Sequence, residues 1–360
     1  MKALQYDAYG VPPRLVQIEE PTCPADGVLV RVEATGLCRS DWHSWQGHDP
    51  VELPQVPGHE YAGVVVAVGP TVRRWQVGDR VTAPFVLGCG ACDYCLAGEA
   101  QVCPDQRQPG FTDQGSFAEL VAVPVADFNL VRLPNAVDFA TAASLGCRFA
   151  TAYRALRVHA RVAAGQWVVV VGCGGVGLSA VMIATTLGAR VIAIDLSAAA
   201  LQRAGELGAE VVLDAADDAA VRAEVIAITG GGAHVGIDAI GHPKAARTSI
   251  HCLRRRGRHV QIGLLLGEAA LTALPMDRVI ALELEVYGSH GMAAADYPGM
   301  LELVASGELR PDLLVSRVIG LADAGDAFVA MGESAGAGIT IVAPCGPAAL
   351  GSWGPEVLRS

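Results

Sequence analysis

Four cysteines lie close together in the first third of the chain: Cys89, Cys92, Cys95 and Cys103. Their spacing, C-x2-C-x2-C-x7-C, allows four thiolates to surround one Zn(II) ion tetrahedrally, with each sulfur about 2.3 Å from the metal. Because the set contains no histidine and leaves no ligand position open, it predicts a closed, structural zinc site. Four buried apolar cysteines, two disulfides or an iron–sulfur cluster are the alternatives.

Three further residues could bind a second metal, although they lie far apart in the chain. Cys38 lies in the segment GLCRSDWH, His59 in PGHE and Cys147 in LGCRF. A catalytic zinc needs three protein ligands and one exchangeable position. Each residue is weak evidence by itself, since a single cysteine is usually a small buried apolar residue.

A glycine-rich segment indicates a dinucleotide site. Gly172, Gly174 and Gly177 form G-x-G-x-x-G after an apolar run and before a helical pattern. In this context the glycines let the backbone approach a pyrophosphate at a helix N-terminus. Asp195 ends the next expected strand, where a carboxylate accepts hydrogen bonds from ribose hydroxyls and repels the 2′-phosphate of NADP. The pattern therefore favours NAD over NADP, with a helix N-cap as the alternative role of Asp195.

Strand and helix patterns alternate around these glycines. The expected strands are Trp167–Val171, Val191–Ile194, Glu210–Leu213, Val235–Ile240, His259–Gly263 and Glu285–Tyr287. The helical patterns between them include Val176–Leu187 and Ala198–Leu207. This alternation predicts a parallel, doubly wound sheet with helices on both faces.

The chain before residue 149 has a different pattern. Strand-like segments such as 27–34 and 61–68 are separated by turns rich in proline and glycine, which favours a mostly antiparallel β domain. The segment after residue 290 is too short to fold alone and is expected to return to that domain. We therefore predict an α/β protein with two domains, residues 1–148 with 290–360 and residues 149–289, as 360 residues would allow.

The composition argues against several classes of partner. With 26 basic and 37 acidic residues, the chain carries a formal net charge of −11, which disfavours nucleic-acid binding. We interpret its dense basic run, residues 254–258, as a solvated helix end. The N-terminus has no apolar core of a signal peptide, and glycines interrupt the apolar stretch 167–184, so no membrane span is expected. Clustered cysteines then fit metal binding in the reducing cytoplasm.

Together these motifs resemble those of the medium-chain, zinc-containing alcohol dehydrogenases over nearly the whole chain. The matching segments, in the order of the family, are GLCRSD, GHEYAG, the four-cysteine set, CRFAT and GCGGVG. The resemblance implies a Rossmann cofactor domain and a mostly β, GroES-like catalytic domain that carries both zinc sites. It also implies two Zn(II) ions per subunit, NAD as the cofactor and a homodimer or homotetramer, with 285–287 as a possible edge for sheet pairing.

The resemblance assigns a second metal site. Three residues would bind the catalytic zinc: Cys38, His59 and Cys147. Asp41 would orient the imidazole of His59, and Glu60 would lie behind the metal and could approach it.

The implied reaction is a reversible hydride transfer between a primary or secondary alcohol and NAD, which gives an aldehyde or ketone. A proton would leave the alcohol through Ser40, the nicotinamide ribose and His43. Phe85 matches a family position in the alcohol pocket, and Trp42 could narrow that pocket, with simple packing as the alternative.

Further positions match cofactor contacts of the family. Arg39 corresponds to a residue that binds the pyrophosphate, Thr151 and Val176 to residues that touch the nicotinamide, and Gly175 lies within the glycine-rich turn. Ala200 is a departure, because the family often has a lysine there, and this implies weaker NAD binding.

Arg148 is a second departure, since small residues are common at its position in the family. Two other functions remain open. One is a polyol or amino-alcohol dehydrogenase of the same superfamily. The other is a non-catalytic zinc- or redox-sensing protein, which would not need Ser40 and His43. A zinc-free reductase is disfavoured, because such proteins lack both cysteine sets.

Overall fold

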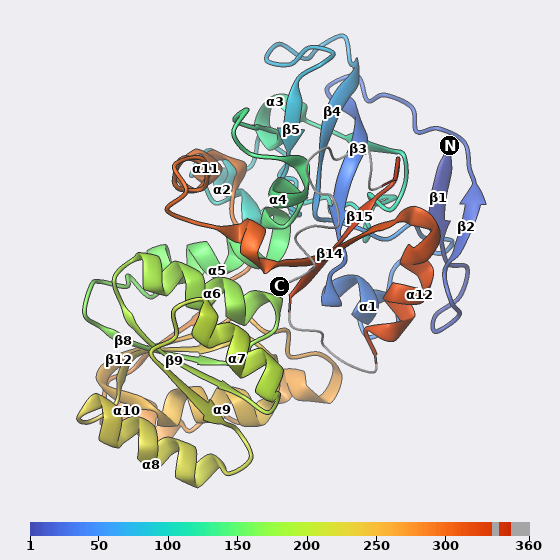
Figure 1. The fold of residues 1–360 in the computed structure, drawn as a ribbon. Coiled ribbons are helices and arrows are strands. Elements are labelled where there is room, and N and C mark those ends of the chain that lie inside the picture. Colours follow the sequence, from blue (N-terminus) through green and yellow to red (C-terminus); the bar gives the residue numbers. More distant parts are fainter. Residues whose placement is uncertain (333–337, 347–360) are drawn as a thin grey trace. The chain divides into compact units, whose positions relative to one another are not determined.

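The computed structural model describes residues 1–332 and 338–346, and its contacts divide the chain into two compact units (Figure 1). One unit contains Met1–Ala150 and most of the described chain from Gly291 onward, and the other contains Thr151–His290. Each unit has its own sheet and its own apolar core.

The second unit is built on a six-stranded sheet in the order β10-β9-β8-β11-β12-β13, in which every pair is parallel. The strands are β8 (Trp167–Val171), β9 (Arg190–Asp195), β10 (Val211–Asp214), β11 (Ala233–Asp238), β12 (Leu253–Gln261) and β13 (Glu285–Gly288). The strand order reverses between β8 and β11, so the carboxyl ends of these strands form the switch point at which such sheets bind dinucleotides. The predicted doubly wound topology is confirmed.

Helices connect these strands: α6 (Gly175–Thr186), α7 (Ala198–Glu206), α8 (Asp218–Thr229), α9 (Pro243–His251) and α10 (Met276–Ala281). Polar side chains define where they begin, since Ser197 caps α7 and Asp217 accepts from two backbone N–H groups of α8. Gly230, at φ 68°, ends α8 in the left-handed conformation that glycine tolerates.

The prediction of a helix end at residues 254–258 is wrong. Helix α9 ends at His251, and Leu253 already pairs with Ala233, so the run belongs to β12. Three arginines of the run have separate partners. Arg254 contacts His234, Arg256 forms an ion pair with Glu283, and Arg258 forms one with Glu285. The basic residues therefore lie on a parallel strand, where ion pairs and hydrogen bonds compensate their charge, and not at the solvated end of a helix.

The first unit contains a sheet in the order β14-β15-β3-β4-β5-β7, with β6 paired to β3. Its strands are β3 (Val28–Gly36), β4 (Tyr61–Val68), β5 (Arg80–Thr82), β6 (Leu120–Val123), β7 (Val131–Arg132), β14 (Val315–Gly320) and β15 (Ile339–Ala343). All pairs are antiparallel except β14–β15, and a separate hairpin joins β1 (Lys2–Gln5) to β2 (Arg14–Gln17). Valines of β3 and β4 are buried in the core of this unit.

Short helices follow these strands: α1 (Arg39–Trp45), α2 (Asp93–Leu96), α3 (Ala126–Asn129), α4 (Phe139–Ala143), α5 (Ala150–Arg154), α11 (Tyr297–Ala305) and α12 (Ala324–Ala330). Two turns have the wider π geometry, η2 (Leu145–Phe149) and η3 (Ala155–His159). Within the described ranges, no helix combines the length and the apolar character needed to cross a membrane. The stretch 167–184 forms β8 and most of α6, as predicted.

Candidate active site and metal centres

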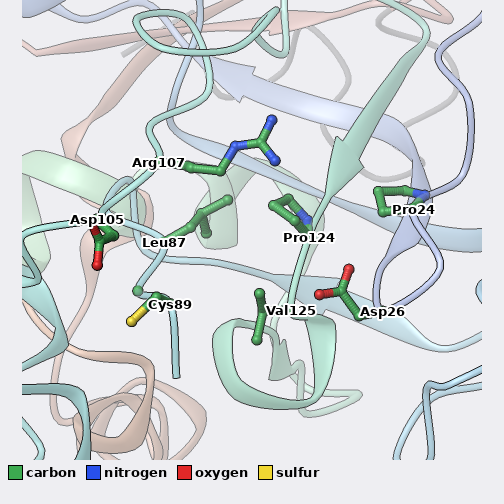
Figure 2. Close-up of a pocket in the computed structure, with 9 residues that line it drawn as sticks. Pro24, Asp26, Leu87, Cys89, Asp105, Arg107, Pro124 and Val125 are labelled. Carbon is green, nitrogen blue, oxygen red and sulfur yellow. The ribbon is translucent and has the colours of Figure 1, made fainter. Parts of the chain in front are cut away.

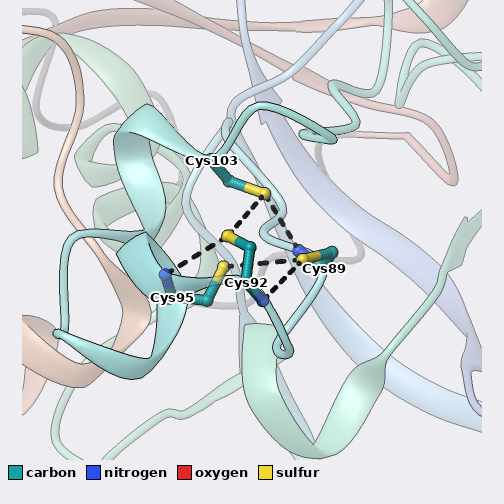
Figure 3. Close-up of side chains that lie close together, drawn as sticks. All are labelled: Cys89, Cys92, Cys95 and Cys103. Carbon is teal, nitrogen blue, oxygen red and sulfur yellow. Dashed lines mark hydrogen bonds between the residues drawn. The ribbon is translucent and has the colours of Figure 1, made fainter.

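The four clustered cysteines converge on one point (Figure 3). Their sulfurs all lie within 4.8 Å of one another, and two pairs are closer: Cys89 to Cys95 at 4.0 Å and Cys92 to Cys103 at 3.7 Å. A tetrahedral zinc site with Zn–S bonds of about 2.3 Å requires sulfurs about 3.8 Å apart. A disulfide requires about 2.05 Å, and no disulfide joins any cysteines in the described part of the chain. The geometry therefore fits a metal and not the disulfide alternative.

Backbone N–H groups surround these sulfurs. Ala91 and Cys92 donate to the sulfur of Cys89 at 3.5 and 3.3 Å, and these bonds lower the pKa of that thiol to about 7. Cys95 donates its N–H to the sulfur of Cys92 at 3.5 Å, at the first turn of α2. Such donors favour thiolate, the form that binds metal, at Cys89, whereas burial raises the pKa of Cys95 and of Cys103.

The second set, Cys38, His59 and Cys147, also converges, and Glu60 joins it. One ligand atom from each of these four residues lies within 4.8 Å of the others. Cys38 lies at the N-cap of α1 directly after β3, His59 and Glu60 directly precede β4, and Cys147 lies in η2. Strand pairing of β3 with β4 therefore brings two of the three segments together, and η2 supplies the third.

The loop that carries Cys38 is supported by the last strand of the sheet. Gly36 and Thr35 of β3 pair with Ile341 and Val342 of β15. Leu37 then donates its N–H to the carbonyl of Thr340 at 2.9 Å. The position of Cys38 is therefore fixed by residues about 300 positions later in the chain.

The imidazole of His59 is oriented by a buried carboxylate. Asp41 Oδ1 accepts from His59 Nδ1 at 2.8 Å and from the N–H of Gly58 at 2.9 Å. Both side chains are fully buried, and His59 Nε2 has no hydrogen-bond partner among the described residues. A buried, unpartnered imidazole nitrogen beside two thiols fits a divalent metal ligand, with Asp41 in the predicted orienting position.

The electrostatics of the two thiols also fit metal binding. A hydrogen bond from Cys147, assisted by the nearby charges of Arg148 and His59, holds the pKa of Cys38 well below its ordinary value. The same contact and burial raise the pKa of Cys147 well above its ordinary value. Because a metal-bound cysteine is a thiolate, a divalent cation would displace the protons that these two thiols carry.

Glu60 is held by Arg148. The guanidinium donates from Nε to Oε1 at 3.1 Å and from Nη2 to Oε2, and the backbone N–H of Arg148 donates to Oε1 at 3.1 Å. Burial raises the pKa of Glu60, while the positive charge of Arg148 opposes that shift. A buried arginine must have a partner, so the departure at position 148 is explained by this ion pair.

Two phenyl rings lie against His59. Phe85 meets its ring edge-on at 5.9 Å between centroids, and Phe111 lies at 5.2 Å in a tilted arrangement. Phe85 is the predicted pocket residue and is buried next to Gly291. Phe111 was not predicted, because it lies in a loop with no recognisable motif around it. The rings form an apolar wall beside the candidate catalytic metal position.

Helix α1 carries the remaining predicted residues of this unit. Ser40 is its second residue, and His43 Nδ1 lies 3.1 Å from His48 Nδ1. Trp42 packs edge-on against both histidines, and the guanidinium of Arg39 covers its ring at 4.4 Å. Trp42 also contacts the core of this unit, so the packing alternative applies at least in part.

The glycine-rich loop lies between β8 and α6, as the strand–turn–helix prediction requires. A side chain on Gly172 would lie 2.3 Å from Ile240, and one on Gly177 only 1.8 Å from the carbonyl of Gly172. A side chain on Gly174 would meet nothing within 4 Å, so this glycine leaves open space next to the helix N-terminus. These are the three roles of such glycines: turn, approach of the ligand and packing.

The carboxylate of Asp195 ends β9 beside this loop. It accepts from the N–H of Cys173 at 2.6 Å and from the N–H of Ser197 at 2.8 Å. The residue that caps α7 is Ser197, so the helix N-cap alternative for Asp195 does not apply. Thr151 and Val176, the predicted nicotinamide contacts, belong to the same unit, with Thr151 buried and Val176 at the start of α6.

A separate pocket of about 210 Å³ lies beside the four-cysteine loop (Figure 2). Its lining includes Cys89, Asp26 and Arg107, and the guanidinium of Arg107 is already paired with Asp113. None of the residues around His59 lines this pocket, so it is not the candidate active site.

Sequence comparison identifies the family. Residues 24–135 match the model of the alcohol dehydrogenase GroES-like domain, and residues 175–306 match that of the zinc-binding dehydrogenases. The chain therefore belongs to the medium-chain, zinc-containing alcohol dehydrogenase family.

Individual proteins are similar over most of their length. An alcohol dehydrogenase of Geobacillus stearothermophilus is 34% identical over 313 residues, which cover 86% of this chain and 90% of that protein. The crystal structure of an NAD-dependent alcohol dehydrogenase matches with a TM-score of 0.86 at 30% identity, over 95% of this chain and 99% of that one. A thermostable alcohol dehydrogenase from Pyrobaculum aerophilum, solved with cobalt and zinc, matches with a TM-score of 0.83 at 29% identity, over 96% and 99% of the two chains.

Proposed function

We propose that this protein is a zinc-dependent, NAD-linked alcohol dehydrogenase. It would catalyse reversible hydride transfer between a primary or secondary alcohol and NAD, giving an aldehyde or ketone. The observation that supports this most strongly is the convergence of Cys38, His59 and Cys147, with His59 Nε2 buried and unpartnered. Two thiolates and an imidazole leave a tetrahedral metal one exchangeable position.

Each group of this chain has a defined task in the proposal. A bound zinc supplies Lewis acidity that makes an alcohol easier to deprotonate, and NAD accepts the hydride. Asp41 fixes the imidazole orientation, and Phe85 and Phe111 keep water from one side of the site. The hydroxyl of Ser40 would accept the proton of the alcohol as it releases its own, and His43, whose ring is partly buried, would pass a proton on to solvent.

The four-cysteine loop would hold a second, structural zinc, which gives two ions per subunit. The two sites would belong to a catalytic domain of residues 1–148 and 290–360, with NAD bound by residues 149–289. A colourless preparation that contains about two zinc ions per chain would support this stoichiometry. Iron and a brown colour would instead support an iron–sulfur cluster.

The preference for NAD rests on Asp195. A carboxylate at the end of β9 repels a 2′-phosphate, and Leu196, Ser197 and Ala198 supply no positive charge directly after it. We expect Asp195→Ala to reduce the ratio of kcat/KM for NAD to that for NADP by about tenfold, which corresponds to about 1.4 kcal/mol. Asp214→Ala, at the end of β10, is the matched control. An unchanged ratio in the Asp195 variant would exclude this residue from cofactor selection.

The proposal includes a homodimer or homotetramer. Strand β13 is at one edge of the six-stranded sheet, and Val286 on it is 40% exposed. An unpaired strand edge can extend a sheet into a second copy. Light scattering after size-exclusion chromatography will give the mass in solution, and a monomer would contradict this part.

The decisive experiment is a screen of simple alcohols, polyols and amino alcohols with NAD and NADP, followed through the absorbance of the reduced cofactor. Turnover of simple primary or secondary alcohols with NAD is the expected result. Turnover restricted to polyols or amino alcohols would support the alternative dehydrogenase. Binding of NAD and zinc without turnover of any substrate class would favour the sensing protein.

A further inference from the structure

The buried pair of Glu60 and Arg148 lies at the candidate metal site, and the function proposed above assigns no task to Arg148. Glu60 is fully buried and Arg148 is 7% exposed. Three N–H groups of Arg148, one from its backbone and two from its guanidinium, donate to the carboxylate. The consecutive residues Cys147 and Arg148 of η2 both contribute to this site, Cys147 through its sulfur and Arg148 through its ion pair with Glu60.

The surrounding backbone leaves room for this pair and for little else. A side chain on Gly36 would lie 2.4 Å from Glu60 Oε2 and 3.1 Å from Arg148 Nη2. A side chain on Gly146 would lie 3.0 Å from the Cα of Glu60. The segments around Gly36, Glu60 and Gly146 therefore pack closely around the ion pair and restrict the positions of its side chains.

Glu60 is also a potential fourth ligand. One of its carboxylate oxygens lies within 4.8 Å of the ligand atoms of Cys38, His59 and Cys147. Two thiolates already neutralise a divalent cation, so a free carboxylate would add an uncompensated negative charge in a buried place. The guanidinium supplies the balancing charge and binds both oxygens in a planar fork.

We propose that Arg148 is a positioning residue that holds Glu60 back from the ligand set and so keeps one position of the metal exchangeable. The inference rests on the proposed function only in assuming a metal at this site. Without the fork, Glu60 would complete a closed set of four protein ligands. Substrate would then compete with a carboxylate attached to the same protein.

The test uses full-length enzyme with cobalt in the catalytic site and zinc in the four-cysteine site. Imidazole is the probe, because a ligand entering the exchangeable position changes the visible spectrum of cobalt. We expect Arg148→Met to weaken imidazole binding by about 10- to 100-fold, as for other changes next to metal ligands. The same variant should release cobalt to a chelator more slowly, because it would have four protein ligands.

The double variant Arg148→Met/Glu60→Gln separates this role from simple packing. It removes both charges, so imidazole affinity should return to within about threefold of wild type, while loss of packing alone would give no recovery. Arg148→Lys keeps the charge and loses the planar fork, so it should weaken imidazole binding less than Arg148→Met does. If Arg148→Met does not fold, the imidazole affinity of Arg148→Lys tests the proposal instead.

The proposal would be overturned if Arg148→Met and Arg148→Lys both bound imidazole with wild-type affinity. If Arg148→Met does not fold, wild-type affinity in Arg148→Lys alone would overturn it. These spectra do not depend on turnover. If no alcohol is oxidised but the spectra follow the expected order, only the proposed function fails. If alcohols are oxidised and the spectra are insensitive to position 148, only the role of Arg148 fails.

Discussion

The two cysteine-containing clusters differ in how their ligands are brought together. The four sulfurs of the first cluster come from fifteen consecutive residues on one loop and the short helix α2. The ligands of the second come from positions 38, 59 and 147, which are 21 and 88 residues apart. Each cluster combines buried and partly exposed ligands: Cys95 and Cys103 are buried in the first, and Cys38 and His59 in the second, while Cys89, Cys92 and Cys147 are partly exposed.

The two clusters also differ in what surrounds them. Backbone N–H groups of the same loop stabilise the sulfurs of the first cluster. Side chains of other segments surround the second: a carboxylate on His59, an arginine on Glu60 and two phenyl rings. The first cluster is local, since its ligands come from one loop and can stabilise that loop. The second cluster is distributed, since its ligands come from three segments that the sheet brings together. A distributed cluster can place a metal next to acidic, basic and aromatic side chains.

The largest expected effect belongs to the distributed cluster. Cys38→Ser should reduce alcohol oxidation by at least about 10³-fold, because loss of a Lewis acid removes several kcal/mol of transition-state stabilisation. Metal analysis should show the loss of about one zinc per chain, with an unchanged circular dichroism spectrum. Cys345→Ser, at an exposed thiol outside both clusters, is the control. Full activity of the Cys38 variant would refute the ligand assignment.

Loss of a ligand from the four-cysteine loop should lower the thermal stability of the protein. Cys92→Ala is expected to lower the melting temperature by about 5 °C or more, because a structural zinc contributes several kcal/mol of folding free energy. Differential scanning calorimetry with metal analysis will measure this, and Cys23→Ala is the control at a cysteine outside the loop. The comparison between the clusters fails if the variant keeps its metal and its melting temperature.

A smaller effect is expected at Asp41, which contacts the ligand His59 and not the metal itself. Asp41→Asn should weaken the affinity of the catalytic site for zinc by about 10- to 100-fold, because it alters the hydrogen bond that orients His59. Competition with a chromogenic chelator will measure that affinity, and Asp49→Asn, an exposed residue after the same helix, is the control. Equal affinities in both variants would mean that Asp41 has no orienting role.

Much of the second unit follows from sequence patterns. The run 167–171 is apolar throughout and buried throughout, and it forms β8 at the predicted bounds. The expected strand 259–263 is less accurate, because β12 begins six residues earlier, at Leu253 just before the arginine run, and ends at Gln261. Hydrophobic periodicity locates strands whose faces are buried, but it does not detect a strand whose exposed side chains form ion pairs.

The sequence predicts the ligands of the two candidate metal sites better than it predicts the residues that contact those ligands. The spacing of four cysteines predicts their convergence directly, and the family motifs supply Cys38, His59 and Cys147. The partners of these residues do not follow from spacing, since Phe111 and Arg148 reach the site only through loop and turn geometry. One signal for Arg148 was present: an arginine inside the apolar segment 145–150 must be paired if that segment is buried.

The pairing of β15 with β3 determines the order in which the two clusters can mature during synthesis. Every ligand of the four-cysteine loop exists once the ribosome has added Cys103, so that loop can take up metal on a nascent chain. The segment around Cys38 receives its bond from Leu37 to Thr340 only after Thr340 has been synthesised, 237 residues after Cys103. Metal loading of the catalytic centre is therefore expected to follow metal loading of the four-cysteine loop.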